Sequence, residues 1–173
     1  MKKMNKTVLV VDDESDVRNY LKSALENSGF DVMTANNGFE ALEIMKENLP
    51  DLISLDLVMP KHSGMKFYRE MQKNKEWSKI PVLIVTGHAR DELGKVDFDT
   101  LMMQGPGVYL EKPVKPNTFI EKVCLLLNIE LPENIERQKD SDDEQQRQQL
   151  LDSLAKTDTE TLKKALDAIK KKK

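Results

Sequence analysis

Acidic side chains follow two apolar runs of the chain, in positions where carboxylates can bind a cation. Asp12 and Asp13 come directly after the run at 8–11, and Asp56 comes directly after the run at 53–55. Ligand sites in parallel sheets lie outside the carboxyl ends of the strands, so these side chains are expected to meet at one edge. Carboxylate oxygens are the ligands that Mg2+ prefers. The spacing therefore favours a magnesium site, although a single acid at a strand end is often only a turn residue.

Two later strand ends also carry polar side chains. Thr86 closes the apolar run at 80–85, and Lys112 with Pro113 follows the short run at 108–110. A hydroxyl can donate a hydrogen bond to an anionic oxygen, and an ammonium group can pair with one. Four strand ends therefore carry polar side chains that could meet at one edge of the sheet.

The order of these residues resembles that of the receiver domain of two-component response regulators, over roughly residues 6–128. The resemblance implies that Asp56 accepts a phosphoryl group from the phosphohistidine of a histidine kinase or a histidine phosphotransfer protein. A carboxylate is a weak nucleophile toward an anionic phosphoryl group, so the site must neutralise charge. By resemblance, the Mg2+ ligands are Asp12, Asp13, Asp56 and the backbone carbonyl of Val58.

The resemblance also implies roles for three residues at the later strand ends. Lys112 meets the phosphoryl oxygens during transfer, and the Thr86 hydroxyl bonds one of them afterwards. Tyr109 takes the position of the family's switch aromatic, which turns inward when the threonine moves. The peptide bond between Lys112 and Pro113 is expected to be cis, an isomer that proline makes accessible.

The apolar periodicity predicts an α/β fold. Strand-like runs alternate with segments of helical period, and these runs lie at 7–11, 31–35, 51–55, 80–85 and 108–110. By resemblance the fold is flavodoxin-like, a doubly wound five-stranded parallel sheet in the order 2-1-3-4-5 with helices on both faces. The segment 87–107 departs from the family pattern. Its helix is expected to begin late, with Asp97 or Asp99 as the cap.

Composition divides the chain of 173 residues into a receiver domain at 1–128, a polar linker at 129–149 and an amphipathic α-helical C-terminal tail at 150–173. The tail carries two short apolar stripes, formed by Leu150, Leu151 and Leu154 and by Leu162, Leu166 and Ile169. Isolated helices of this length are marginal in water, so they are expected to pack on a partner. The candidates are the receiver surface, a second copy of the chain in a homodimer, or a downstream protein.

Charge and hydropathy argue against two other classes of protein. A net charge of −3 and a tail without glycine or aromatic residues give no reason to expect DNA binding. Only four apolar residues stand together near the N-terminus, too few for a signal peptide or membrane insertion. The protein is expected to be cytoplasmic. Its single cysteine, Cys124, allows no internal disulfide and is expected to be buried.

Two further functions remain open besides that of a phosphoacceptor. An aspartate-nucleophile phosphohydrolase would need a second aspartate two residues after the nucleophile, where this chain has Val58. A phosphorylation-silent adaptor on the same fold is the other alternative. We expect no enzyme beyond self-phosphorylation from small phosphodonors and self-dephosphorylation. The histidines, His62 and His88, are interpreted as loop residues.

Overall fold

Five short strands form one parallel sheet in the computed structural model, which describes residues 3–60, 63–87, 108–133 and 135. The sheet order is β2-β1-β3-β4-β5, as the family resemblance implied. The strands are β1 (Thr7–Val11), β2 (Asp31–Ala35), β3 (Leu52–Leu55), β4 (Val82–Thr86) and β5 (Tyr109–Glu111). The α/β fold class and the doubly wound strand order are therefore confirmed.

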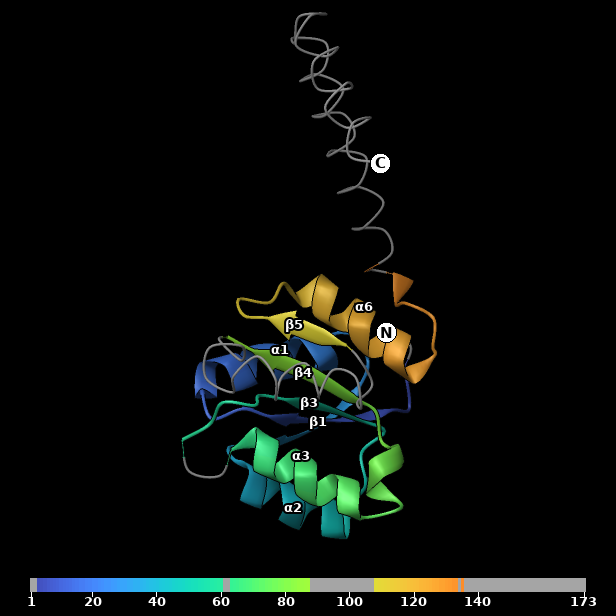
Figure 1. Cartoon of the computed structure of the whole chain (residues 1–173). Coiled ribbons are helices and arrows are strands. Elements are labelled where there is room, and N and C mark those ends of the chain that lie inside the picture. Colours follow the sequence, from blue (N-terminus) through green and yellow to red (C-terminus); the bar gives the residue numbers. More distant parts are fainter. Residues whose placement is uncertain (1–2, 61–62, 88–107, 134, 136–173) are drawn as a thin grey trace, which may run out of the picture. The chain divides into compact units, whose positions relative to one another are not determined.

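Helices cover both faces of this sheet (Figure 1). Helices α2 and α3 contact one another on one face, and α1 and α6 contact one another on the other. Their bounds, with those of a short 3-10 turn η1, are α1 (Ser15–Glu26), α2 (Gly38–Glu47), α3 (Gly64–Lys73), η1 (Trp77–Lys79) and α6 (Pro116–Leu127). The helix expected near Asp97 or Asp99 and the tail at 150–173 lie outside the described residues. No described helix is long and apolar enough to cross a bilayer.

Local sequence signals explain where several helices begin and end. The Asn37 side chain accepts hydrogen bonds from the backbone N–H groups of Phe39 and Glu40 and so caps α2. Pro116 occupies the first turn of α6, where its missing N–H costs nothing. Asn128 ends that helix in the left-handed region, with φ 52°. Each signal is local, because it involves only residues at the helix end itself.

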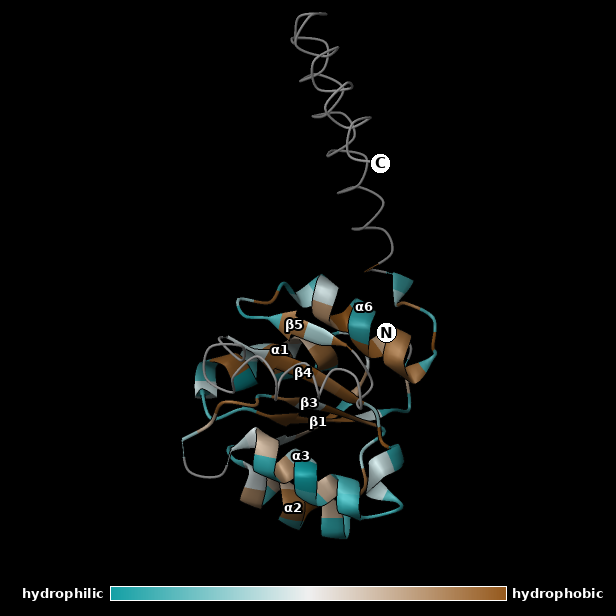
Figure 2. Cartoon of the chain, viewed as in Figure 1, coloured by the Kyte–Doolittle hydropathy of each residue, from teal (hydrophilic) through white to brown (hydrophobic). Residues whose placement is uncertain are grey.

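The core lies between the sheet and its two helical layers. The apolar residues of β1, β3 and β4 are buried on both faces, as expected for central parallel strands (Figure 2). Leu25 of α1 and Phe119 of α6 are fully buried, as is Phe67 of α3. Cys124 is buried in α6, as predicted. This packing fixes the strands, and with them the positions of the residues that follow their carboxyl ends.

Candidate functional site

The sheet register places Asp12 and Asp56 side by side. Val11 and Leu55 are partners on the adjacent strands β1 and β3, and each aspartate is the next residue along its strand. The backbone N–H of Asp56 donates to the Val11 carbonyl at 2.9 Å, and the N–H of Asp12 donates to the Ala35 carbonyl at 3.1 Å. Main-chain hydrogen bonds therefore fix the backbone of both aspartates at the carboxyl ends of β1 and β3.

Asp13 joins these two residues in an acidic cluster suited to a divalent cation. Each of Asp12, Asp13 and Asp56 offers one carboxylate oxygen, and these oxygens lie within 4.8 Å of one another. Asp12 and Asp56 are buried, whereas Asp13 is exposed. Two oxygens that share one Mg2+ lie at most about 4.2 Å apart, twice the length of the bond to the metal. Small side-chain movements would close the cluster around Mg2+, so the residues present fit this ion.

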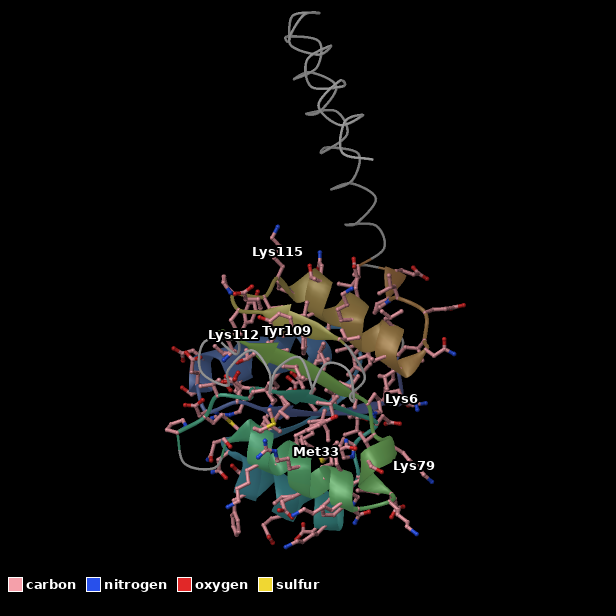
Figure 3. The ribbon with its side chains drawn as sticks, viewed as in Figure 1. Lys6, Met33, Lys79, Tyr109, Lys112 and Lys115 are labelled. Atoms are coloured by element: carbon pink, nitrogen blue, oxygen red, sulfur yellow. The ribbon has the colours of Figure 1, made fainter. Side chains whose placement is uncertain are left out.

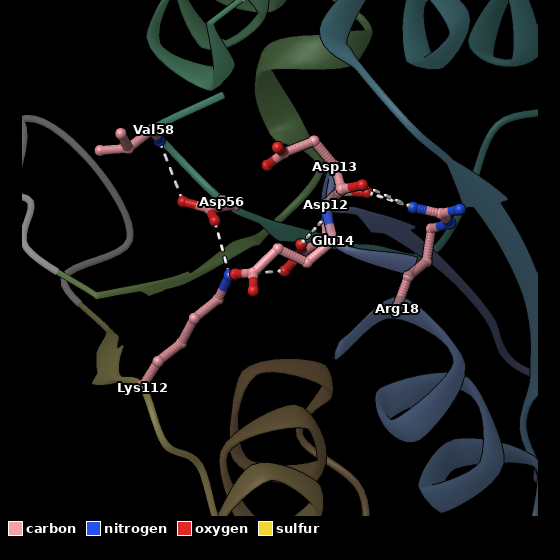
Figure 4. Close-up of polar contacts among 7 residues, drawn as sticks. All are labelled: Asp12, Asp13, Glu14, Arg18, Asp56, Val58 and Lys112. Atoms are coloured by element: carbon pink, nitrogen blue, oxygen red, sulfur yellow. Dashed lines mark hydrogen bonds and ion pairs between the residues drawn. The ribbon is translucent and has the colours of Figure 1, made fainter. Parts of the chain in front are cut away.

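Lys112 reaches this cluster from the last strand. The register pairs Thr86 with Glu111, and the backbone N–H of Lys112 donates to the Thr86 carbonyl at 3.0 Å. Its ammonium nitrogen lies 2.7 Å from Asp56 Oδ2, 2.9 Å from Asp12 Oδ2 and 3.0 Å from Glu14 Oε1 (Figure 4). The Lys112 side chain is only 14% exposed. The peptide bond that follows it, to Pro113, is cis.

Burial and pairing act in opposite directions on the charges of this site. Burial raises the pKa of Asp12, and the adjacent Lys112 ammonium offsets only part of this effect. Burial alone would lower the pKa of Lys112, but its hydrogen bonds with Asp56, Asp12 and Glu14 outweigh that effect and raise it well above its ordinary value. The lysine is therefore a permanent cation that neutralises part of the buried negative charge.

Each carboxylate oxygen of Asp56 has its own partner. The backbone N–H of Val58 donates to Oδ1 at 2.9 Å, and Lys112 donates to Oδ2 at 2.7 Å (Figure 4). These two bonds fix the plane of the carboxylate at the end of β3. The use of the Val58 carbonyl as a metal ligand stays a prediction.

Thr86 and Tyr109 lie on the neighbouring strands β4 and β5. Thr86 is fully buried, and its hydroxyl oxygen has no hydrogen-bond partner within the described part of the chain. A buried hydroxyl left without a partner costs about 1–3 kcal/mol. Tyr109 is partly buried against the core, on the strand that leads to Lys112 (Figure 3). An inward turn of Tyr109 stays a prediction, and His62 and His88 lie outside the described residues.

Three residues at the site were not singled out from the sequence. Glu14 contacts Lys112, and the Arg18 guanidinium donates to the backbone carbonyl of Asp12 at 2.7 Å and, more weakly, to that of Asp13 at 3.4 Å (Figure 4). Gly64, the first residue of α3, lies against the backbone of Asp56. Glu14 as a third acid in a row and Arg18 one turn further along the chain were the available signals.

Known proteins share both the sequence pattern and the fold. A model of the response regulator receiver domain matches residues 8–124. The chain is 37% identical over 126 residues to the alkaline phosphatase synthesis transcriptional regulatory protein PhoP of Bacillus subtilis, covering 72% of this chain and 49% of PhoP. It therefore spans about half the length of that relative. It is 32% identical over 120 residues to the polar-differentiation response regulator DivK of Brucella anthropi, covering 69% of this chain and 94% of DivK.

Solved structures agree with these sequence relatives. A putative response regulator from Chloroflexus aurantiacus superposes with a TM-score of 0.63 at 27% identity, covering 73% of this chain and 99% of that one. The chemotaxis response regulator CheY4 of Vibrio cholerae gives a TM-score of 0.61 at 26% identity, covering 70% and 98%. With its sheet order and the match over residues 8–124, the chain belongs to the response regulator receiver domain family.

Proposed function

We propose that this protein is the phosphoacceptor of a two-component system and that Asp56 receives the phosphoryl group. The supporting observation is the environment of its carboxylate, which is buried, hydrogen-bonded on both oxygens and flanked by two further carboxylates. One Asp56 oxygen bonds to phosphorus as the bond from phosphorus to the donor's imidazole nitrogen breaks. The electron pair of that bond returns to the imidazole. The donor is a histidine kinase or a histidine phosphotransfer protein.

Different groups around Asp56 would neutralise or bind the negatively charged oxygens of the phosphoryl group. Asp12, Asp13 and Asp56, with the Val58 carbonyl, would hold Mg2+, which supplies positive charge at the phosphoryl oxygens when bound. Lys112 would contact a phosphoryl oxygen, because its ammonium group lies 2.7 Å from Asp56 and so is already near the incoming group. The Thr86 hydroxyl is available to donate to another phosphoryl oxygen after transfer.

Phosphorylation with a small donor such as acetyl phosphate tests this assignment directly. We expect Mg2+-dependent incorporation of one phosphoryl group, mapped by mass spectrometry to Asp56 and absent from Asp56→Asn. Asp51→Asn is the matched control, since Asp51 precedes the same strand at its other end. Incorporation elsewhere, or equal incorporation in Asp56→Asn, would refute the assignment, and no incorporation at all would favour the silent adaptor.

Two further variants separate capture of the phosphoryl group from the response to it. Lys112→Ala is expected to lose most phosphorylation, because the ammonium group meets the phosphoryl oxygens during transfer. Thr86→Ala is expected to remain phosphorylated but to lose the rearrangement that follows, which the Tyr109 ring environment reports in NMR spectra. Loss of phosphorylation in Thr86→Ala as complete as in Asp56→Asn would contradict this division.

The output of the switch is proposed from the sequence alone. The segment at 150–173, after the polar linker at 129–149, would act as a protein-interaction element whose docking responds to phosphorylation at Asp56. Its apolar stripes need a partner, which is the receiver surface, a second copy or a downstream protein. Hydrogen exchange at 150–173 is expected to slow in one phosphorylation state. Equally rapid exchange in both states, with candidate partners present, would contradict the proposal.

A further inference from the structure

The Lys112 ammonium group has three carboxylate partners, and they differ in what else they can bind. An ammonium group has three N–H donors, and here they face Asp12, Asp56 and Glu14. Asp12 and Asp56 belong to the acidic cluster that fits a divalent cation, and Glu14 does not. Among the described residues, Glu14 is therefore the lysine partner that a bound cation leaves unused. Its side chain is 61% exposed and so lies on the solvent side of Lys112.

The backbone holds Glu14 in this place at some cost to the helix that it begins. Its N–H donates to Asp12 Oδ1 at 2.9 Å, and its carbonyl accepts the first helical bond, from the N–H of Arg18, at 2.9 Å. Glu14 is thus the N-cap of α1, but its side chain makes no capping hydrogen bond. Serine, threonine, aspartate or asparagine would cap better. The Glu14 side chain contacts Lys112 instead of the end of the helix.

Given the proposed function, on which this rests, we infer that Glu14 is a positioning residue that retains the Lys112 ammonium group when Asp12 and Asp56 turn to a divalent cation. A lysine without this partner would move into solvent when its two buried partners are withdrawn. With Glu14 present, the ammonium group stays beside the acidic cluster, within reach of an incoming phosphoryl group. Glu14 therefore stabilises the cation-bound state of the site more than the empty state, and so raises the affinity for the cation.

The test is a double-mutant cycle on the full chain, with Mg2+ affinity measured by titration calorimetry. Glu14→Gln is expected to weaken Mg2+ binding about three-fold, the size of effect typical of a partly exposed ion pair. In a Lys112→Met background the same substitution is expected to leave the affinity unchanged, because there is no ammonium group to hold. Asp16→Asn, which removes an exposed carboxylate two residues away, is the control for long-range charge and is expected to change neither affinity.

The outcomes of the cycle distinguish the role of Glu14 from the proposed function of the acidic cluster. An equal loss in both backgrounds would mean that the Glu14 charge acts on the cation directly, and the lysine-holding assignment would be wrong. Wild-type affinity in Glu14→Gln would also overturn it, while leaving the phosphoacceptor proposal intact. A wild-type chain that binds no Mg2+ and is not phosphorylated would overturn the proposed function, and the role of Glu14 with it.

The variant Glu14→Ser distinguishes an effect on the position of the Lys112 ammonium group from an effect on the stability of the fold. Serine is a better N-cap than glutamate, so this variant is expected to unfold at the same or a higher temperature than the wild type. Its Mg2+ affinity is nevertheless expected to fall about three-fold, as in Glu14→Gln. If thermal stability and affinity fell together, Glu14 would have only a structural role.

Discussion

Gly64 approaches Asp56 so closely that no side chain fits between them. A β-carbon placed on Gly64 would overlap the backbone carbonyl oxygen of Asp56 and lie 2.9 Å from the Cα of Leu57. Both contacts are with main chain, which cannot move aside without displacing the loop that follows β3. Glycine at the start of α3 therefore allows that helix to lie directly against the backbone of Asp56.

Gly64→Ala is expected to lower the free energy of unfolding by about 1–3 kcal/mol, because a methyl group overpacks this contact. The displaced Asp56 loop should also slow phosphorylation by acetyl phosphate. Gly87→Ala is the matched control, since a β-carbon there meets nothing within 4 Å. Urea unfolding and labelling of both variants give the comparison. Equal behaviour of the two alanine variants would show that the close approach has no consequence.

Thr86→Val is expected to stabilise the fold but to impair the proposed rearrangement that follows phosphorylation. The Thr86 hydroxyl is buried without a hydrogen-bond partner among the described residues, and valine has nearly the same shape without that polar group. Removing an unpaired hydroxyl should raise the free energy of unfolding by about 1 kcal/mol. Thr86→Ser keeps the hydroxyl and serves as the control for function. A destabilised Thr86→Val would mean that the hydroxyl has a partner in solution.

Arg18→Gln is expected to weaken Mg2+ binding about five-fold, an effect somewhat below that typical of groups that orient metal ligands. The guanidinium group binds the carbonyls of Asp12 and Asp13 and so fixes the loop that carries both carboxylates. Removing a cation would by itself favour Mg2+ binding, so weaker binding identifies the loss of positioning. Arg69→Gln, on the exposed face of α3, is the control. Unchanged or tighter binding in Arg18→Gln would contradict this role.

Asp51 is expected to make the stability of the fold depend on pH in the acid range. Its carboxylate accepts from Lys6 Nζ at 2.7 Å and from the backbone N–H of Thr7 at 2.8 Å. Burial alone would raise the pKa of Asp51, but these contacts outweigh it and hold the pKa below the ordinary value of 3.8. The stabilisation is thus present above pH 3.8 and is lost as the pH falls through the lowered pKa.

The corresponding measurement is urea unfolding of Asp51→Asn between pH 7 and pH 2. The variant should be less stable than the wild type by about 1 kcal/mol at pH 7, and the difference should shrink below about pH 4. Asp31→Asn is the control, because the Asp31 pair with Lys3 is largely exposed and worth little. A difference that stays constant down to pH 2 would assign the effect to packing rather than to charge.

The residues that the sequence could identify are those fixed by strand ends. Asp12, Asp56 and Thr86 each stand at the end of an apolar run, and a parallel sheet brings such ends to one edge whatever the side chains do. The sheet order came from the resemblance to a known family rather than from periodicity. Nothing in the described structure corrects the expected strands by more than about two residues, which is the usual uncertainty of element boundaries.

The contacts of Glu14, Arg18 and Gly64 could not be predicted in the same way. Glu14 meets a lysine 98 residues further along the chain, and the pairing depends on where α1 begins and on the path of the chain after β5. Arg18 acts on backbone carbonyls, which every residue has, so no sequence pattern marks its targets. Gly64 is required by the approach of two backbones, a property of the packed fold and not of its neighbours in sequence.

The four residues of β3 separate two aspartates that make different contacts. Asp51, before the strand, binds Lys6 and Thr7 at one end of the sheet, and Asp56, after it, belongs to the acidic cluster at the other. Lys6 and Lys112 mark these opposite ends in Figure 3. Substitutions around Asp51 can therefore change the stability of the fold without replacing any residue of the acidic cluster. Contacts that stabilise the fold and the residues of the acidic cluster thus lie at different ends of one strand.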